Sequence, residues 1–241
     1  MIIDFNVTIG DFPEGKKVRS SDILHLMDRA GIDKAVVSTP GTYSDQVEHA
    51  FLAAETQMHR DRLIPFALLN PKAMKDELEF QKLCDYGFPG IKFSPLAQGY
   101  FPTQCVKLDE ILSWINRENK LVSITTGVTT LGDPAQWLPY IKKWSQIKFI
   151  LLGMGAFDFG YGCVDYAVQY DNVYLETSLQ YEIQILKKAI HKLESGRVLF
   201  GSDMPVKIPE IEILKMQVAN FSDLEYEKVM YAGAKSLLSL Q

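Results

Sequence analysis

The chain has 241 residues, of which 47% are hydrophobic and 23% are charged, and its formal net charge is -5. Such a composition is typical of a globular protein with a full hydrophobic core. The acidic balance argues against binding to nucleic acid or to anionic membranes, and no apolar run reaches the roughly 18 residues of a membrane span. No secretory leader is visible and the three cysteines show no CxxC spacing, so we expect a cytoplasmic protein.

Eight short β-prone runs alternate with helical patterns along the chain. Helical spacing is clearest in Leu108, Ile111, Leu112 and Ile115. This alternation predicts a parallel sheet closed into a (β/α)8 TIM barrel, with residues 1–241 forming a single domain. A doubly wound open sheet is the alternative, which is weakened because no GxGxxG turn follows the first strand. The expected strands are residues 2–7, 34–38, 63–69, 90–93, 121–125, 148–152, 172–176 and 197–201.

The longest irregular stretches that we expect are residues 95–104 and 153–162. Both follow strands, and they therefore lie on the face where barrels of this kind keep their active sites. In the first strand, Asp4, Asn6 and Thr8 fall on one face, because side chains alternate along a strand. The last strand is a buried run that ends at Asp203. Polar groups from both ends of the chain are thus expected at one mouth of the barrel.

The strand segments also carry a family resemblance. In chain order they are MIIDFNVTIG (1–10), PGIKFSP (89–95), LVSITTG (121–127), FILLGMG (149–155), VYLETS (173–178) and RVLFGSDMP (197–205). Together they resemble the metal-dependent amidohydrolases, in the amidohydrolase-2 branch related to amino-carboxymuconate-semialdehyde decarboxylase. The resemblance implies an amidohydrolase-like barrel with a divalent metal that activates water and polarises a carbonyl group.

The metal ligands that the resemblance implies are largely replaced in this chain. Histidines are expected in the family where Asn6, Thr8, Thr125 and Gly153 stand, and only the aspartate at Asp203 is present. Amide and hydroxyl oxygens are weak zinc ligands, and glycine has no side chain to offer. We therefore expect a degenerate member with no tightly bound metal and no cofactor; a loosely held magnesium or calcium ion is the alternative. The four histidines are expected on helix surfaces, away from strand ends: His25, His49, His59 and His191.

Asp203 is the candidate catalytic residue, as a general base toward water. The alternative is that it bonds the backbone of its own loop. Lys92 is a candidate for binding an anionic substrate, and the alternative is an internal ion pair with Glu176 or Asp203. The hydroxyl groups of Thr125 and Thr126 either contact a ligand or satisfy one another, and Asp4 is expected to be structural. The full set of expected substrate-binding residues is Asn6, Thr8, Lys92, Ser94, Thr125, Thr126 and Glu176.

Two functional interpretations follow. The favoured one is a pseudoenzyme that binds a small carboxylated molecule, or that serves as a homo-oligomer or as the partner subunit of an active relative. The alternative is a metal-independent hydrolase, such as a lactonase, or a lyase, in which Asp203 activates water and Lys92 holds the substrate. A shortage of further cations at the mouth weakens it. A metal-dependent hydrolase with unusual ligands ranks third.

Overall fold

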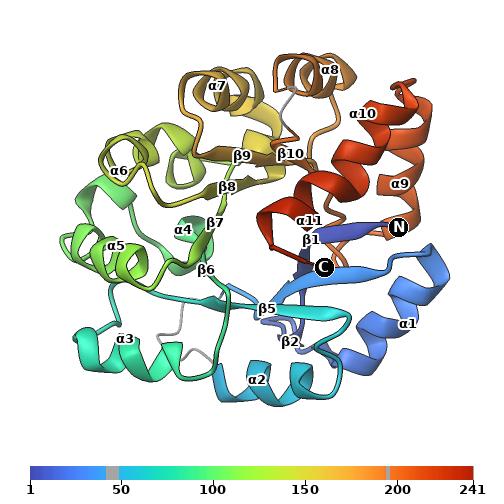
Figure 1. Cartoon of the computed structure of the whole chain (residues 1–241). Coiled ribbons are helices and arrows are strands. Elements are labelled where there is room, and N and C mark those ends of the chain that lie inside the picture. The colour runs from blue at the N-terminus through green and yellow to red at the C-terminus, as the bar shows by residue number, and fades with distance from the viewer. Residues whose placement is uncertain (42–48, 194–195, 241) are drawn as a thin grey trace.

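The computed structural model describes residues 1–41, 49–193 and 196–240, and its centre is a barrel of eight parallel strands (Figure 1). The strands follow one another in chain order around the ring, and adjacent strands from the first to the last pair in parallel. The predicted fold is therefore confirmed. The strands are β1 (Ile3–Thr8), β4 (Lys34–Ser38), β5 (Leu63–Leu68), β6 (Gly90–Phe93), β7 (Leu121–Thr125), β8 (Phe149–Leu152), β9 (Val173–Glu176) and β10 (Val198–Leu199).

The ring closes where the last strand meets the first. The Phe5 amide donates a hydrogen bond to the Phe200 carbonyl at 2.8 Å, and the Thr8 amide donates to the Met204 carbonyl at 3.0 Å. Strand β10 is shorter than the predicted run 197–201, because Phe200 leaves the ladder and donates its amide to Val229 instead. We call the line of contacts between β1 and residues 198–204 the seam.

Helices cover the outside of the barrel, as Figure 1 shows. The predicted stripe of α5 is fully buried at Leu108, Ile111, Leu112 and Ile115. The expectation that 95–104 and 153–162 are irregular was wrong, since both stretches contain helix. The helices are α1 (Ser20–Ala30), α2 (His49–Gln57), α3 (Glu77–Cys84), α4 (Pro95–Gln98), α5 (Leu108–Arg117), α6 (Leu138–Lys143), α7 (Ala156–Gln169), α8 (Ile183–Lys192), α9 (Pro209–Val218), α10 (Asp223–Glu227) and α11 (Gly233–Leu237).

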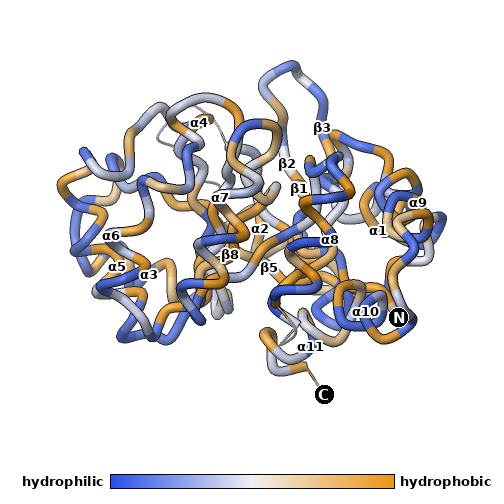
Figure 2. The backbone as a smooth tube through the Cα atoms, turned by 90° about the horizontal axis from the view of Figure 1, so that it is seen from above, coloured by the Kyte–Doolittle hydropathy of each residue, from blue (hydrophilic) through white to orange (hydrophobic). Residues whose placement is uncertain are grey.

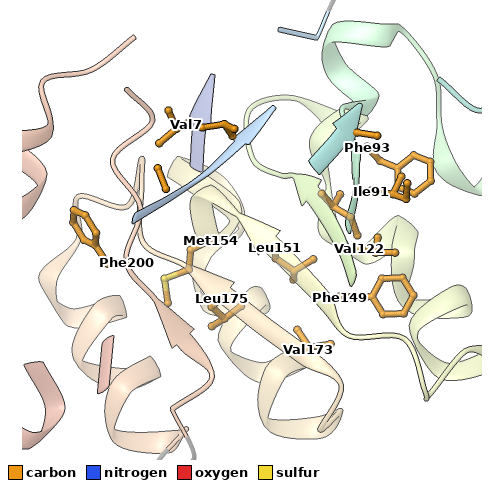
Figure 3. Close-up of a cluster of buried hydrophobic side chains, with 14 of the residues drawn as sticks. Val7, Ile91, Phe93, Val122, Phe149, Leu151, Met154, Val173, Leu175 and Phe200 are labelled. Atoms are coloured by element: carbon orange, nitrogen blue, oxygen red, sulfur yellow. The ribbon is translucent and has the colours of Figure 1, made fainter. Parts of the chain in front are cut away.

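Apolar side chains fill two layers. The outer layer lies between strands and helices, where Figure 3 shows Ile91, Val122, Phe149 and Leu151. Inside the barrel, a smaller cluster includes Phe5 and Phe66, whose rings meet edge to face with centroids 5.7 Å apart. Strand alternation creates this division, because neighbouring residues of one strand point to opposite faces.

The two ends of the barrel differ. Helix α11 packs its apolar residues, Ala234 and Leu237 among them, against the inner cluster at the end where the strands begin. At the opposite end, a hairpin of β2 (Gly10–Asp11) and β3 (Lys17–Val18) follows β1 and projects away from the barrel (Figure 2). The mouth at the carboxyl ends of the strands is thus the end that α11 does not cover. Within the described ranges, no helix is both long and apolar enough to span a membrane.

Candidate functional site

Polar side chains replace apolar ones at the inner face of the mouth. Gly90 faces inward, since a Cβ atom there would lie 2.3 Å from the ring of Phe66, and Lys92 shares that face two residues later. Lys92 approaches Asn6 of β1, while Asp203 follows β10 across the ring. Residues far apart in sequence therefore meet at the mouth because the strands bring their carboxyl ends together.

Lys92 is a buried amine that forms few contacts with polar groups. Its side chain is only slightly exposed (8% for the residue), and its Nζ atom donates one long hydrogen bond, 3.4 Å, to Asn6 Oδ1. Among the described residues, no carboxylate oxygen lies within 4.0 Å of Nζ, so the ion pair considered for Lys92 is not formed. Burial lowers the pKa of Lys92, while the charges of Asp203 and Glu176 act in the opposite direction.

Glu176, the last residue of β9, is a buried carboxyl group that is hydrogen-bonded within the protein. Its carboxyl group accepts hydrogen bonds from the Gly153 amide at 2.9 Å, from the Ser178 hydroxyl at 2.8 Å and from the Ser178 amide. The residue has no exposed surface, and burial raises its pKa to about 7. A Cβ atom on Gly201 would lie 2.1 Å from Glu176 Oε1, which shows how closely the chain encloses this group. Glu176, predicted to contact a ligand, is thus enclosed on every side in this structure, and its carboxyl group is hydrogen-bonded within the protein.

Asp4 has the structural role expected for it. Its carboxyl group accepts hydrogen bonds from the amides of Asn6 and Ser202, each at 3.0 Å, and from the Ser202 hydroxyl. Burial raises the pKa of Asp4 to about 7, although the three donors act against that rise. The bonds to Ser202 join β1 to the segment that follows β10, so Asp4 stabilises the seam.

Asp203 is placed differently from the other two carboxyl groups. It is partly exposed and its backbone has a left-handed φ of 58°. Its backbone carbonyl accepts hydrogen bonds from the amides of Val206 and Lys207, whereas its carboxylate has no hydrogen bond or ion pair in the described part of the chain. The carboxylate therefore does not cap its loop. Burial raises the pKa of Asp203, and the positive charges of Lys92 and Lys207 oppose the rise.

The hydroxyl groups of the mouth fall into two kinds. Thr126 donates to the Leu152 carbonyl at 2.8 Å and accepts from the Gly155 amide at 3.0 Å, so its hydroxyl is satisfied within the protein, by the backbone and not by Thr125. The hydroxyls of Thr8, Ser94 and Thr125 have no hydrogen bond to any described residue. Thr125 is half-buried, and Thr8 and Ser94 are slightly exposed.

The donors at the mouth do not fit a zinc ion. Gly153 has a φ of 73°, and a Cβ atom there would lie 3.2 Å from Leu179 Cδ1, so Leu179 occupies the space that a larger side chain would need. The described residues contain no group of three or more histidine, cysteine, aspartate or glutamate side chains placed to hold a metal ion. Among the described residues, the mouth offers one accessible carboxylate, Asp203, which lies within electrostatic range of the Lys92 amine. A catalytic zinc needs three protein ligands.

The histidines differ in part from the prediction. His25 and His191 are exposed on helices, but His59 lies in a turn after α2. His49 is half-buried, and its Nε2 atom lies 2.8 Å from the carbonyl of Leu68, the last residue of β5. His49 is thus near a strand end, although it lies on α2 outside the barrel. Burial lowers its pKa.

Several aromatic side chains in the loops that follow the strands are exposed. Phe157 is 60% exposed and Tyr181 51% exposed, and their rings lie 5.4 Å apart. Lys207 donates to the Tyr181 hydroxyl at 2.6 Å, while Phe101 is 37% exposed. These exposures show that neither Phe101 nor Phe157 forms a buried lid.

The fold also matches known structures. The 2,6-dihydroxybenzoate decarboxylase from Rhizobium is 16% identical, with a TM-score of 0.76 over 99% of this chain and 98% of that one. A probable 2-pyrone-4,6-dicarboxylic acid hydrolase from Acinetobacter baumannii, with citric acid bound, is 15% identical, with a TM-score of 0.76 over 99% of both chains. The 5-carboxyvanillate decarboxylase from Sphingomonas paucimobilis is 12% identical, with a TM-score of 0.76 over 100% and 99%. At these identities the likeness shows the fold.

Sequence comparison identifies the family. Among curated proteins no sequence matches this chain. The family model described as amidohydrolase, by contrast, matches residues 18–240, from the hairpin after β1 to the residues that follow α11. A match over nearly the whole barrel, in a chain whose eight strands have the same arrangement as the solved relatives, means that this protein belongs to the amidohydrolase family.

Proposed function

We propose that this protein binds a small carboxylated molecule at the mouth of its barrel without a metal ion and without turnover. The observation that supports it most is a difference in hydrogen bonding among the polar side chains of the mouth. Some, which we call occupied, are hydrogen-bonded within the protein; others, which we call available, have few or no hydrogen bonds to described residues. Asp4, Thr126 and Glu176 are engaged by the protein's own donors and acceptors. Within the described part of the chain, Lys92 Nζ has one long hydrogen bond and the Asp203 carboxylate has none.

The available groups suit a carboxylate. Lys92 supplies a positive charge with up to three donors, and the hydroxyls of Thr8 and Thr125 can each donate a further hydrogen bond. Asp203 can accept from a hydroxyl group of the same ligand. Relatives of similar fold are named for acids of this class, including 2,6-dihydroxybenzoate and 2-pyrone-4,6-dicarboxylic acid. Their names support the choice of ligand class.

Loss of the family's metal is part of the proposal. The positions where the resemblance implies histidines hold Asn6, Thr8, Thr125 and Gly153, and Leu179 fills the space beside the glycine. A buried ammonium group would also repel a divalent ion at this place. In this proposal Lys92 supplies the positive charge that a metal supplies in other members of the family.

Calorimetric titration with 2,6-dihydroxybenzoate and with citrate tests the proposal. Lys92→Met should weaken binding about 10- to 100-fold, because a hydrogen bond to a charged group contributes roughly 1.5–3 kcal/mol. The matched control Lys142→Met, at an exposed lysine of α6, should bind as the parent does. Binding should also survive treatment with a chelator. Stoichiometric zinc, manganese or iron in the purified protein, or equal binding by the Lys92→Met variant, would contradict the proposal.

A metal-independent hydrolase is the second candidate, and the unbonded carboxylate of Asp203 favours it. Asp203 would take a proton from a water molecule as that water attacks a lactone carbonyl, and Lys92 would stabilise the negative charge that develops on oxygen. Turnover of 2-pyrone-4,6-dicarboxylate by the parent protein, abolished in Asp203→Asn and retained in Asp165→Asn, would establish this candidate over the binder. Asp165 is exposed on α7 and paired with Lys188. Absence of turnover by the parent would leave binding as the function.

A further inference from the structure

We infer that Lys92 is a carbonyl-reactive amine, which captures a 2-oxo acid at the barrel mouth as a covalent iminium adduct. The inference rests on the proposed carboxylate site and goes beyond it, because it assigns Lys92 a bond-forming role and narrows the ligand to acids with a carbonyl group next to the carboxylate.

The geometry around Lys92 favours a nucleophile over a structural cation. A lysine that serves only structure is normally paired when it is buried. Lys92 has one long contact, to the neutral oxygen of Asn6, and no carboxylate oxygen within ion-pair distance among the described residues. Burial lowers its pKa, which increases the share of neutral amine. Desolvation of this kind is one of the ways in which proteins activate a lysine toward carbonyl groups.

Asp203 is the candidate proton donor for the reaction. Its negative charge acts to raise the pKa of Lys92, and the positive charge of Lys92 acts to lower the pKa of Asp203, so each group lies within electrostatic range of the other. The Asp203 carboxylate has no hydrogen bond or ion pair with another described residue, and burial raises its pKa. A carboxyl group of this kind can exchange protons with both the attacking nitrogen and the leaving oxygen. Thr8 and Thr125 supply hydroxyl donors for the neighbouring carboxylate of the acid.

The proposed step balances without an oxidant or a reductant. The neutral Lys92 nitrogen attacks the carbonyl carbon, and the electron pair of the carbonyl bond moves to oxygen. The nitrogen, now positively charged, releases one proton and the oxygen takes one up, which gives a neutral carbinolamine with a lone pair on nitrogen. Asp203 then protonates the hydroxyl group, the carbon–oxygen bond breaks, and water leaves as the nitrogen lone pair forms the carbon–nitrogen double bond. Overall, an amine and a ketone give an imine, protonated as the iminium, and one water molecule.

Reductive trapping tests the inference. The full-length protein is incubated at neutral pH with pyruvate and cyanoborohydride, and the peptides are analysed by mass spectrometry. The peptide containing Lys92 should gain the mass of pyruvic acid less one oxygen atom. Burial lowers the pKa of Lys92 and so raises its neutral fraction, and Lys92 should therefore be labelled faster than the exposed Lys142.

Variants separate the inference from the proposed site. Lys92→Arg keeps a positive charge but cannot form the imine, so it should lose the label while its melting temperature stays close to that of the parent. Asp203→Asn should slow labelling of Lys92, and Lys142→Met should leave it unchanged. Labelling of Lys92 no faster than that of Lys142, in a protein that still binds citrate in the calorimeter, overturns the inference and leaves the proposed binding function intact. If the parent protein does not bind citrate in the calorimeter, the binding proposal is wrong, whatever the labelling shows.

Discussion

Replacing Glu176 with glutamine should change how the stability of the protein depends on pH. The carboxyl group is fully buried, and burial raises its pKa from 4.5 to about 7. Between these values the folded state holds a proton that the unfolded chain releases, so the free energy of unfolding falls as pH rises through this window. The difference of roughly 2.5 pKa units, at about 1.4 kcal/mol each, corresponds to about 3.5 kcal/mol lost between about pH 4.5 and pH 7.

The glutamine variant should not show this loss. At pH 5 its amide nitrogen can donate to the Ser178 hydroxyl but cannot accept from the Gly153 amide, which leaves one buried donor without a partner. That defect costs about 1–3 kcal/mol, so Glu176→Gln should be less stable than the parent at pH 5. Between pH 5 and pH 8 the parent loses most of this stability, about 3.5 kcal/mol in all, whereas the variant loses none of it because glutamine does not titrate. At pH 8 the two proteins should therefore be equally stable, or the variant should be the more stable one.

Urea unfolding followed by tryptophan fluorescence at several pH values between 5 and 8 measures both curves. The matched control is Glu110→Gln, at an exposed position of α5, whose profile should run parallel to that of the parent. The shifts at Asp4 and Asp203 are present in all three proteins and largely cancel in the comparison. Parallel curves for the parent and Glu176→Gln would refute the reasoning, because they would mean that Glu176 does not titrate in this window.

Three further substitutions test the packing, with urea unfolding as the measurement. Gly90→Ala should destabilise the protein by about 2–3 kcal/mol, since its Cβ atom would lie 2.3 Å from the ring of Phe66; an unchanged midpoint would contradict the close fit. Gly162→Ala in α7 meets no atom closer than 3.6 Å and should stabilise by about 0.5–1 kcal/mol, so a loss of stability would be evidence against open space there. Ser202→Ala removes two of the bonds at the seam, one of them to Asp4, and should cost about 2–3 kcal/mol. An unchanged urea midpoint would show that the hydrogen bond from the Ser202 hydroxyl to Asp4 does not stabilise the protein.

The barrel was predictable because its signals are local. Strand β7 falls at the predicted residues 121–125, and the stripe of α5 is buried as its spacing indicated. Alternation along a strand was also sufficient to place Lys92 on an inward face. The predicted end of the last strand failed for a reason that is not local, since Phe200 bonds to Val229 of a later helical segment.

The division of the site into occupied and available groups was not predictable. It depends on pairs such as Asn6 with Ser178, which are 172 residues apart, and Asp4 with Ser202, which are 198 apart. Leu179 fills the space beside Gly153 only because its own backbone adopts a φ of 65°, which is unusual for leucine and has no signature in the sequence. Residue types indicated that the mouth is polar, but only the three-dimensional contacts distinguish Asp203 from Glu176.

The seam has a consequence for how the protein is made. Strand β1 is synthesised well before the partners that it needs on one edge, Phe200 and Met204, both of which follow β10 in the chain. Until these partners are synthesised, β1 has an unpaired edge, and Asn6 on β1 is separated from Asp203. The binding mouth therefore exists only in the completed ring. A ligand that reaches across the mouth from one side of the seam to the other should favour ring closure during folding, by binding the closed state alone.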